Sequence, residues 1–217
     1  MSTNERPEFI ITDLRLEDED RVRQAAQILV DAFVEMAPRD WRDLDSALEE
    51  VREMLAPERL CRVAVTPDGE VLGWVGGIPE YDGHVWELHP LAVRPDMQRR
   101  GVGRALVEDF EEQVRARGAL TVMLGTDDEA GWTSLSGVDL YEATWDKIKN
   151  IRNTGGHPYE FYQKLGYTIT GVVPDANGPG KPDILMSKRV GPLPGEGTDV
   201  TPGALHLEER LRDEGGA

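Results

Sequence analysis

The stretch over residues 84–105, HVWELHPLAVRPDMQRRGVGRA, constrains the fold of this chain more than any other segment. Its apolar residues predict a β-strand over residues 84–93, and Pro90 inside it cannot pair with a neighbouring strand, so the strand must bulge there or lie at an edge. Two glycines, Gly101 and Gly103, then lead into a helix. A strand, a bend, a glycine loop and a helix N-terminus together can hold a pyrophosphate-bearing molecule beside a general base.

The glycine loop predicts an anion site. Glycine has no Cβ, so the backbone at Gly101 and Gly103 can approach a phosphate closely. The free N–H groups of the helix that follows point at the anion, and the helix dipole favours it. No Gly-Lys-Ser/Thr ending or GxGxxG pattern is present, and an ordinary left-handed turn is the alternative interpretation. The residues expected to bind the anion are Gln98, Arg99, Arg100, Gly101, Val102, Gly103 and Arg104.

The rest of the chain alternates between strands and helices. The spacing of apolar residues predicts helices over residues 19–36, 41–55, 102–117, 138–151 and 158–165. Strands are predicted over residues 8–16, 61–66, 70–78, 119–126, 167–173 and 184–190. The continuous apolar run at 119–126 is typical of a strand covered on both faces, and Gly76-Gly77 allows a close backbone approach. Residues 1–190 are expected to form one domain, and residues 191–217, rich in Gly, Pro and acidic residues, a flexible tail.

Composition excludes several classes of function. The net charge of −17 argues against nucleic-acid binding, since phosphates repel such a surface, and would attract a polycation. The single Cys61 allows no internal disulfide, which fits a reducing compartment. No secretory signal and no apolar run of about 20 residues is present, so we expect a cytoplasmic protein that does not span a membrane. No His/Cys/Asp cluster has the spacing of metal ligands.

Residues 60–190 resemble the GNAT superfamily of acetyl-CoA-dependent N-acetyltransferases, and are most similar to the aminoglycoside 6′-N-acetyltransferases. The motifs that carry the resemblance are Q-R-R-G-V-G, W-E-L-H-P-L, L-G-T-D-D, H-P-Y-E-F-Y-Q-K-L-G-Y, P-D-A-N-G and K-P-D-I. The resemblance implies an α/β fold with a mixed, mostly antiparallel twisted sheet and helices on both faces. It also implies acetyl-CoA as co-substrate, an aminoglycoside or other polycationic amine as acceptor, antibiotic resistance, and a homodimer.

The resemblance also implies that the acceptor amine attacks the acetyl thioester directly. Glu87 is the candidate base, since its apolar neighbours would raise the pKa of a carboxyl, although a solvent-facing glutamate is the alternative. The backbone N–H of Leu91 is the candidate oxyanion donor, and Tyr162 is the candidate acid for the leaving thiolate. The strand residues expected to bind the cofactor are Leu91, Ala92 and Val93. Many family members have an asparagine where this chain has Gly155.

A polycationic acceptor needs carboxylates, whose hydrogen bonds to ammonium groups are charge-assisted. Asp127 and Asp128 follow the strand at 119–126, where ligands tend to lie in open α/β sheets. The full set of residues predicted to contact the acceptor is Trp41, Glu87, His89, Asp127, Asp128 and Glu142.

Two other functions remain open at this point. The same fold could acetylate another amine, such as a polyamine or a protein N-terminus, and an acidic loop would suit a polyamine equally well. A non-catalytic acetyl-CoA-binding protein would keep the glycine loop without turnover. The presence of both Glu87 and Tyr162 favours an enzyme.

Overall fold

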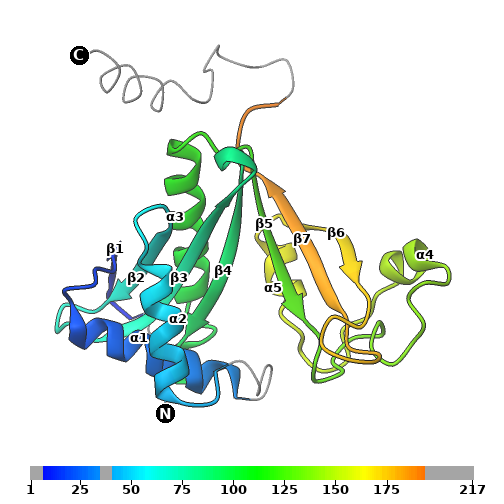
Figure 1. Cartoon of the computed structure of the whole chain (residues 1–217), viewed down its shortest axis with the longest axis horizontal. Coiled ribbons are helices and arrows are strands. Elements are labelled where there is room, and N and C mark those ends of the chain that lie inside the picture. Colours follow the sequence, from blue (N-terminus) through cyan, green and yellow to red (C-terminus); the bar gives the residue numbers. More distant parts are fainter. Residues whose placement is uncertain (1–6, 35–40, 194–217) are drawn as a thin grey trace, which may run out of the picture.

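The computed structural model describes residues 7–34 and 41–193. Its centre is a seven-stranded sheet in the order β1-β2-β3-β4-β5-β7-β6 (Figure 1). All neighbouring strands are antiparallel except β4 and β5, which confirms the predicted mixed, mostly antiparallel sheet. The strands are β1 (Ile10–Asp13), β2 (Leu60–Val65), β3 (Val71–Glu80), β4 (Val85–Val93), β5 (Thr121–Asp127), β6 (Thr168–Val173) and β7 (Asp183–Arg189).

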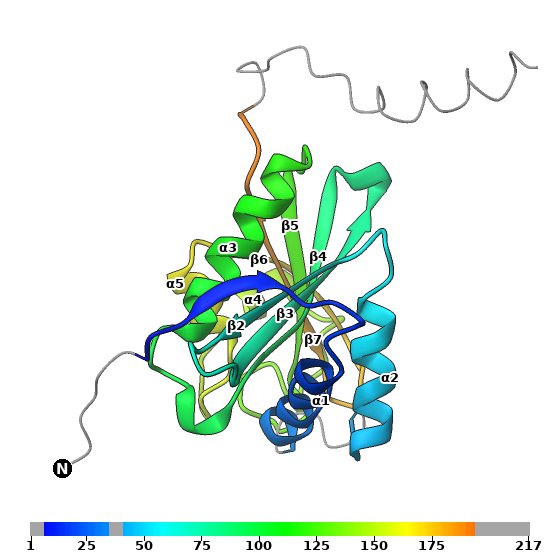
Figure 2. The same ribbon diagram turned by 90° about the vertical axis from the view of Figure 1, so that its left-hand side faces the viewer.

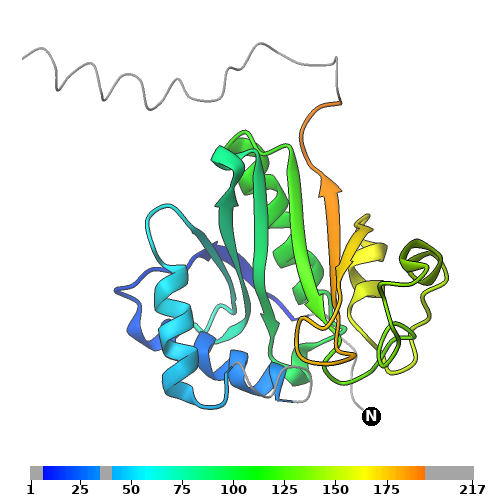
Figure 3. The same cartoon turned by 45° about the vertical axis from the view of Figure 1, so that its right-hand side comes forward.

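Helices cover both faces of the sheet, as expected. Figure 2 shows α3 on one side of the sheet and α1 and α2 on the other. Figure 3 shows β7 between β5 and β6 in the second half of the sheet. The helices are α1 (Glu19–Phe33), α2 (Leu44–Met54), α3 (Val102–Ala116), α4 (Thr144–Lys149) and α5 (Tyr159–Lys164), with the short 3₁₀ turns η1 (Tyr81–Gly83) and η2 (Pro95–Met97).

Helix α3 is fixed to the sheet by one apolar stripe. Val102, Leu106, Phe110 and Val114 recur at helical spacing and are fully buried. Burial of each such side chain stabilises the fold by about 2 kcal/mol. The ring of Phe110 lies against Gly77 of β3, where a Cβ would come within 2.2 Å of it. The predicted close approach at the glycine pair of β3 is therefore confirmed.

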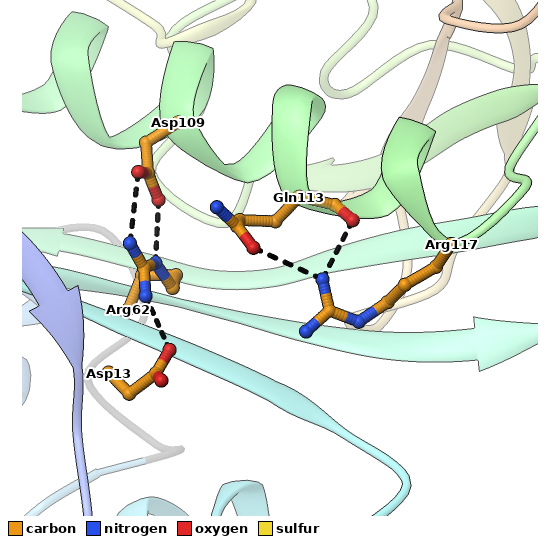
Figure 4. A network of polar contacts seen from close by, with 5 residues as sticks. All are labelled: Asp13, Arg62, Asp109, Gln113 and Arg117. Atoms are coloured by element: carbon orange, nitrogen blue, oxygen red, sulfur yellow. Dashed lines mark hydrogen bonds and ion pairs between the residues drawn. The ribbon is translucent and has the colours of Figure 1, made fainter.

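An ion-pair clamp joins the first strands to α3. The guanidinium of Arg62, on β2, donates from Nε and Nη2 to the two carboxylate oxygens of Asp109 on α3, at 2.7 and 3.1 Å. Its Nη1 also donates to Asp13 of β1 (Figure 4). These bonds outweigh the effect of partial burial and raise the pKa of Arg62. The clamp therefore keeps α3 in register with the edge of the sheet.

The predicted helix over residues 138–151 is wrong in its first half. Only α4 is helical, and Ala143 before it has a left-handed φ of 48°. Asp139 accepts a hydrogen bond from the backbone N–H of Tyr141, which favours a turn over a helix. Tyr141 and Trp145, which belong to the apolar spacing that predicted this helix, are 75% and 70% exposed.

Strand β5 is not covered on both faces at its C-terminal end. Its side chains alternate between buried and accessible, and Gly125 and Asp127 are exposed. The buried side packs against the α3 core. The accessible side faces a cleft, which explains why burial alternates along β5 although most of its residues are apolar. The predicted tail at 191–217 lies outside the described residues from residue 194 onward.

Candidate active site

The cleft lies where β4 and β5 separate. The two parallel strands pair only over Val85–Glu87 and Thr121–Met123, and they diverge toward their C-terminal ends (Figure 1). A cavity of about 1410 Å³ is lined by residues of both strands beyond this point, by the glycine loop and by α5. The two strands therefore separate beyond their short paired stretch, and the cavity between them has room for a long ligand.

Strand β4 bulges at Pro90, as predicted. Val75 of β3 pairs with Leu91 and Gly77 pairs with Leu88, so His89 and Pro90 together stand opposite one residue. Leu91 follows the bulge and lines the cavity. Its backbone is therefore carried to the wall of the cleft by the bulge, where an N–H donor would be needed.

The glycine loop leaves the N-terminus of α3 open to the cavity. Gly101 is the N-cap residue, with a left-handed φ of 93°, and Arg99 also has a positive φ, of 60°. No side chain of the described residues caps the helix, and its first turn contains no acid. A Cβ on Gly101 would meet nothing within 4 Å, so the backbone can be approached freely.

This geometry fits a phosphate-bearing group. The helix dipole and uncapped N–H groups favour an anion, and Arg99, Arg100 and Arg104 add positive charge at the cavity wall. Of the residues predicted to bind the cofactor, those that line the cavity are Leu91, Val93, Gln98, Arg99, Arg100, Gly101, Gly103 and Arg104. The side chains of Ala92 and Val102 are buried in the core, so only their backbone could contribute.

Glu87 stands at the inner end of the cleft. It is half-buried and belongs to the last pair between β4 and β5, with Met123. The cavity lining begins at the next residue of β4, Leu88. Glu87 shares its face of the strand with His89. Its carboxylate is therefore near the point where the cleft closes.

Two aspartates face each other on neighbouring strands beside the cleft. Asp127 of β5 and Asp183 of β7 are direct partners in an antiparallel pair, so their side chains lie on the same face. Burial, together with the charge of Asp127, raises the pKa of Asp183 to about 6. One carboxylate oxygen of Asp183, Oδ1, is buried with no hydrogen-bond partner among the described residues.

Asp183 has room because Gly125 has no side chain. A Cβ on Gly125 would lie 2.5 Å from Oδ2 of Asp183. Gly125 and Asp127 both line the cavity, and Asn177 donates a side-chain hydrogen bond to Asp127. Asp183 follows Pro182 in the K-P-D-I motif, but sequence reasoning gave it no role. Its signal was the motif alone.

Asp128 does not face the cleft as predicted. It is 1% exposed, and its carboxylate accepts hydrogen bonds from the backbone N–H groups of Trp132 and Thr133 and from the hydroxyl of Thr133. These bonds fold the loop that follows β5, so Asp128 holds the loop and leaves Asp127 at the cavity. Glu142 is exposed, and the cavity lining of the described part of the chain does not include it.

Trp132 explains the departure at Gly155. A Cβ on Gly155 would lie 2.3 Å from Cδ1 of the Trp132 indole. Both residues line the cavity. An asparagine at position 155 would therefore clash with the indole, which fills the space beside the backbone there.

Tyr162 reaches the cavity from α5. It lines the cavity together with Phe161, which is partly buried and also packs against the core. Its ring packs edge-on against Tyr167 at 5.6 Å, and burial raises the pKa of its phenol, so the group keeps its proton at neutral pH. Two other tyrosines of the same motif, Tyr159 and Tyr167, are buried and do not line the cavity that the structure describes.

His89 and Trp41 form the wall that faces α2. Both residues line the cavity, and their ring centroids are 6.1 Å apart. Trp41 lies before the N-terminus of α2 and not within the helix, since Asp43 is the N-cap residue. Within residues 7–34 and 41–193, no group of three His, Cys, Asp or Glu side chains could hold a metal ion, and no helix is long and apolar enough to cross a membrane.

Comparisons with known proteins agree on one family. The model of the acetyltransferase (GNAT) family matches residues 22–131. The structure of an aminoglycoside 6′-N-acetyltransferase complexed with coenzyme A superposes with a TM-score of 0.78 at 43% identity, over 85% of this chain and 99% of that one. The aminoglycoside 6′-N-acetyltransferase from Enterococcus faecium gives a TM-score of 0.77, with the same identity and coverage.

A curated relative is similar over a shorter stretch. The mycothiol acetyltransferase of Stackebrandtia nassauensis is 33% identical over 90 residues, which make up 41% of this chain and 29% of that enzyme. The matched stretch is thus less than a third of the relative. Its chemistry, like that of the two structures, is acetyl transfer.

Proposed function

Since the chain belongs to the GNAT family of acetyltransferases, we propose that it transfers the acetyl group of acetyl-CoA to the 6′-amine of an aminoglycoside. The observation that carries the proposal is the 43% identity to two aminoglycoside 6′-N-acetyltransferases over 99% of their chains. The acids beside the cleft suit a polycationic acceptor.

Acetyl-CoA is the co-substrate, and it supplies the activated acetyl thioester. Its pyrophosphate would lie at the N-terminus of α3, against the backbone of Gly101 and the nearby arginines. The gap between β4 and β5 would take the rest of the molecule, with Leu91 and Val93 along one side.

The protein groups then have three tasks. Glu87 accepts the proton of the attacking amine, directly or through a water molecule. The backbone N–H of Leu91 donates to the oxygen that gains negative charge. Tyr162 donates its phenolic proton to the leaving thiolate, whose pKa is about 8.5 by analogy with cysteine.

Binding of the acceptor falls to the other face of the cleft. Asp127 binds an ammonium group, and Trp41 and His89 form the opposite wall. Asp128 supports this site by fixing the loop after β5. The homodimer that the resemblance implies and the cytoplasmic location expected from the composition stay predictions.

The test is release of free thiol from acetyl-CoA in the presence of kanamycin B, spermidine and a short peptide with a free N-terminus. We expect turnover with kanamycin B at a kcat/KM well above that of the other two. Preference for spermidine or the peptide would indicate a GNAT enzyme for another amine. Tight binding of acetyl-CoA without turnover on any amine would indicate a binding protein.

A further inference from the structure

The carboxylate of Glu50 does not line the cavity that the structure describes, but it contacts two aromatic rings that do. Glu50 lies on α2, and its Oε1 is 3.6 Å from Nε2 of His89. Its other oxygen, Oε2, accepts a hydrogen bond of 3.4 Å from the indole N–H of Trp41. The cavity lining of the described residues includes both rings but not Glu50. Glu50 therefore acts on the cleft only through its neighbours.

The same helix also holds the backbone of the bulge. Met54, one turn after Glu50, packs against the place where Gly76 has no side chain. A Cβ at Gly76 would lie 2.3 Å from the carbonyl oxygen of His89 and 2.6 Å from Cγ of Met54. Helix α2 thus fixes the backbone of His89 through packing and its ring through Glu50.

The surroundings of His89 favour its charged form. Burial of the ring is the largest single effect and opposes the charge, but Glu50, followed by Glu87 on β4 and Asp127 on β5, together outweigh it, so the pKa of His89 is raised. The hydrogen bond to His89 in turn lowers the pKa of Glu50, against its own burial and with help from Trp41 and Arg59. The two groups form a partly exposed ion pair at the cleft.

A charged imidazole has an N–H on each nitrogen, whereas a neutral one has a single N–H. The nitrogen of His89 that faces Glu50 is Nε2, which is 3.6 Å from the carboxylate. Protonation is therefore needed for Nδ1 to donate as well. An acceptor rich in hydroxyl and ether oxygens offers partners for such a donor at the wall of the cleft.

We propose that Glu50 is a positioning residue for the acceptor: it fixes the rings of Trp41 and His89 and keeps His89 a double donor, so that Nδ1–H can bind an oxygen of the acceptor. This inference rests on the proposed function, since it assigns the residue a task in the same cleft. Glu50 would therefore determine how His89 on β4 binds oxygens of the acceptor, although Glu50 itself does not contact the acceptor.

The test compares Glu50→Gln with Glu49→Gln, which makes the same change at an exposed position next to it on α2. NMR titration of the imidazole signals gives the midpoint for His89, assigned by its loss in His89→Gln. In Glu50→Gln we expect this midpoint to fall by about 0.5 to 1 pH unit. We expect the KM for kanamycin B at pH 7.5 to rise roughly three- to tenfold and the KM for acetyl-CoA to stay within about twofold. Glu49→Gln should match the wild type in all three.

An unchanged His89 midpoint in Glu50→Gln would overturn the proposal, as would an equal rise in both KM values, which would indicate a general loosening of α2. Failure of the proposed function looks different: the wild-type protein would then acetylate another amine and leave kanamycin B unchanged. The kinetic comparison would in that case use the amine that is acetylated. The His89 titration tests the pairing of Glu50 with His89 independently of any acceptor.

Discussion

At the scale of single residues, Asp183 beside the cleft stands where a negative charge is unfavourable. Asp183 lies directly opposite Asp127, and a like charge on the neighbouring strand opposes its ionisation in addition to burial. A residue that costs stability and lies against the wall of a cleft, here beside Gly125, indicates selection for binding and not for folding. A cationic acceptor would offset this repulsion.

The cost of Asp183 should be measurable as a dependence of stability on pH. Its pKa is about 6 in the folded protein, against an ordinary value of 3.8. Between these values the folded protein binds more protons than the unfolded one, so stability falls as pH rises through this window and stays lower above it. In Asp183→Asn we expect the free energy of unfolding at pH 7.5 to be higher by about 1–2 kcal/mol, with the difference lost below about pH 4. Urea unfolding at the two pH values would contradict this if the variant were no more stable at pH 7.5.

Tyr162 is tested by removal of one oxygen. We expect Tyr162→Phe to lower kcat by about 10²-fold, since a positioned acid typically contributes that much or more, while the KM for acetyl-CoA changes little. Tyr159→Phe is the matched control, because Tyr159 is on the same helix and buried but does not line the cavity described here. Equal losses in both variants would show that a buried hydroxyl, and not an acid at the cleft, was removed.

At the scale of elements, the site depends on how α3 is attached to the sheet. The N-terminus of α3 carries the glycine loop, and its middle is held to β2 by Arg62 and Asp109. The side chain of Arg62 is only 11% exposed. Its removal leaves the partly buried carboxylate of Asp109 without its cation.

Loss of this clamp should weaken the fold and spare the chemistry. We expect Arg62→Met to lower the free energy of unfolding by about 2–3 kcal/mol, measured by urea unfolding, with kcat and both KM values unchanged at 25 °C. The double variant Arg62→Met/Asp109→Leu should recover most of the loss, because the partly buried charge of Asp109 is then removed and the remaining partner of Arg62, Asp13, is exposed to solvent. If Arg62→Met were as stable as the wild type, the clamp would contribute nothing measurable to the stability of the fold.

The sequence predicted those elements whose pattern is local. The strand at β4, its proline bulge and the glycine loop before α3 follow from residue types and spacing, and they are confirmed. The helix over residues 138–151 was wrong because apolar spacing there is met by exposed Tyr141 and Trp145, and Asp139 starts a turn instead. Periodicity cannot distinguish an exposed ring from a buried one.

At the scale of the whole molecule, the cleft joins parts that are far apart in the chain. Glu50 on α2 meets His89 on β4, and Asp183 on β7 lies beside Asp127 on β5. Neither contact could be predicted, since nothing in the spacing of a helical glutamate or of a strand aspartate specifies its partner. The role of Asp128 was missed for a different reason: its partners, Trp132 and Thr133, lie in its own loop, and an aspartate after a strand can equally bind a ligand or fold the loop.

The cleft has a positively charged part and a negatively charged part, which suit an anionic cofactor and a cationic acceptor. The helix N-terminus with its arginines and Asp127 both line the cleft, and we propose that the former binds the anionic cofactor and the latter the acceptor. The net charge of −17 would raise the local concentration of a polycation around the molecule. The rate constant for acceptor binding should therefore fall as salt is added. Stopped-flow measurement of kcat/KM for kanamycin B at 20 and 300 mM NaCl would contradict this if the value rose.

The central claim is that the acetyl group goes to the 6′-amine. The most direct measurement is two-dimensional NMR of the product formed from kanamycin B and acetyl-CoA. The account predicts one new acetyl group, bonded to the nitrogen at position 6′, and no product from paromomycin, which has a hydroxyl there. An acetyl group on any other nitrogen of kanamycin B, or turnover of paromomycin, would contradict it.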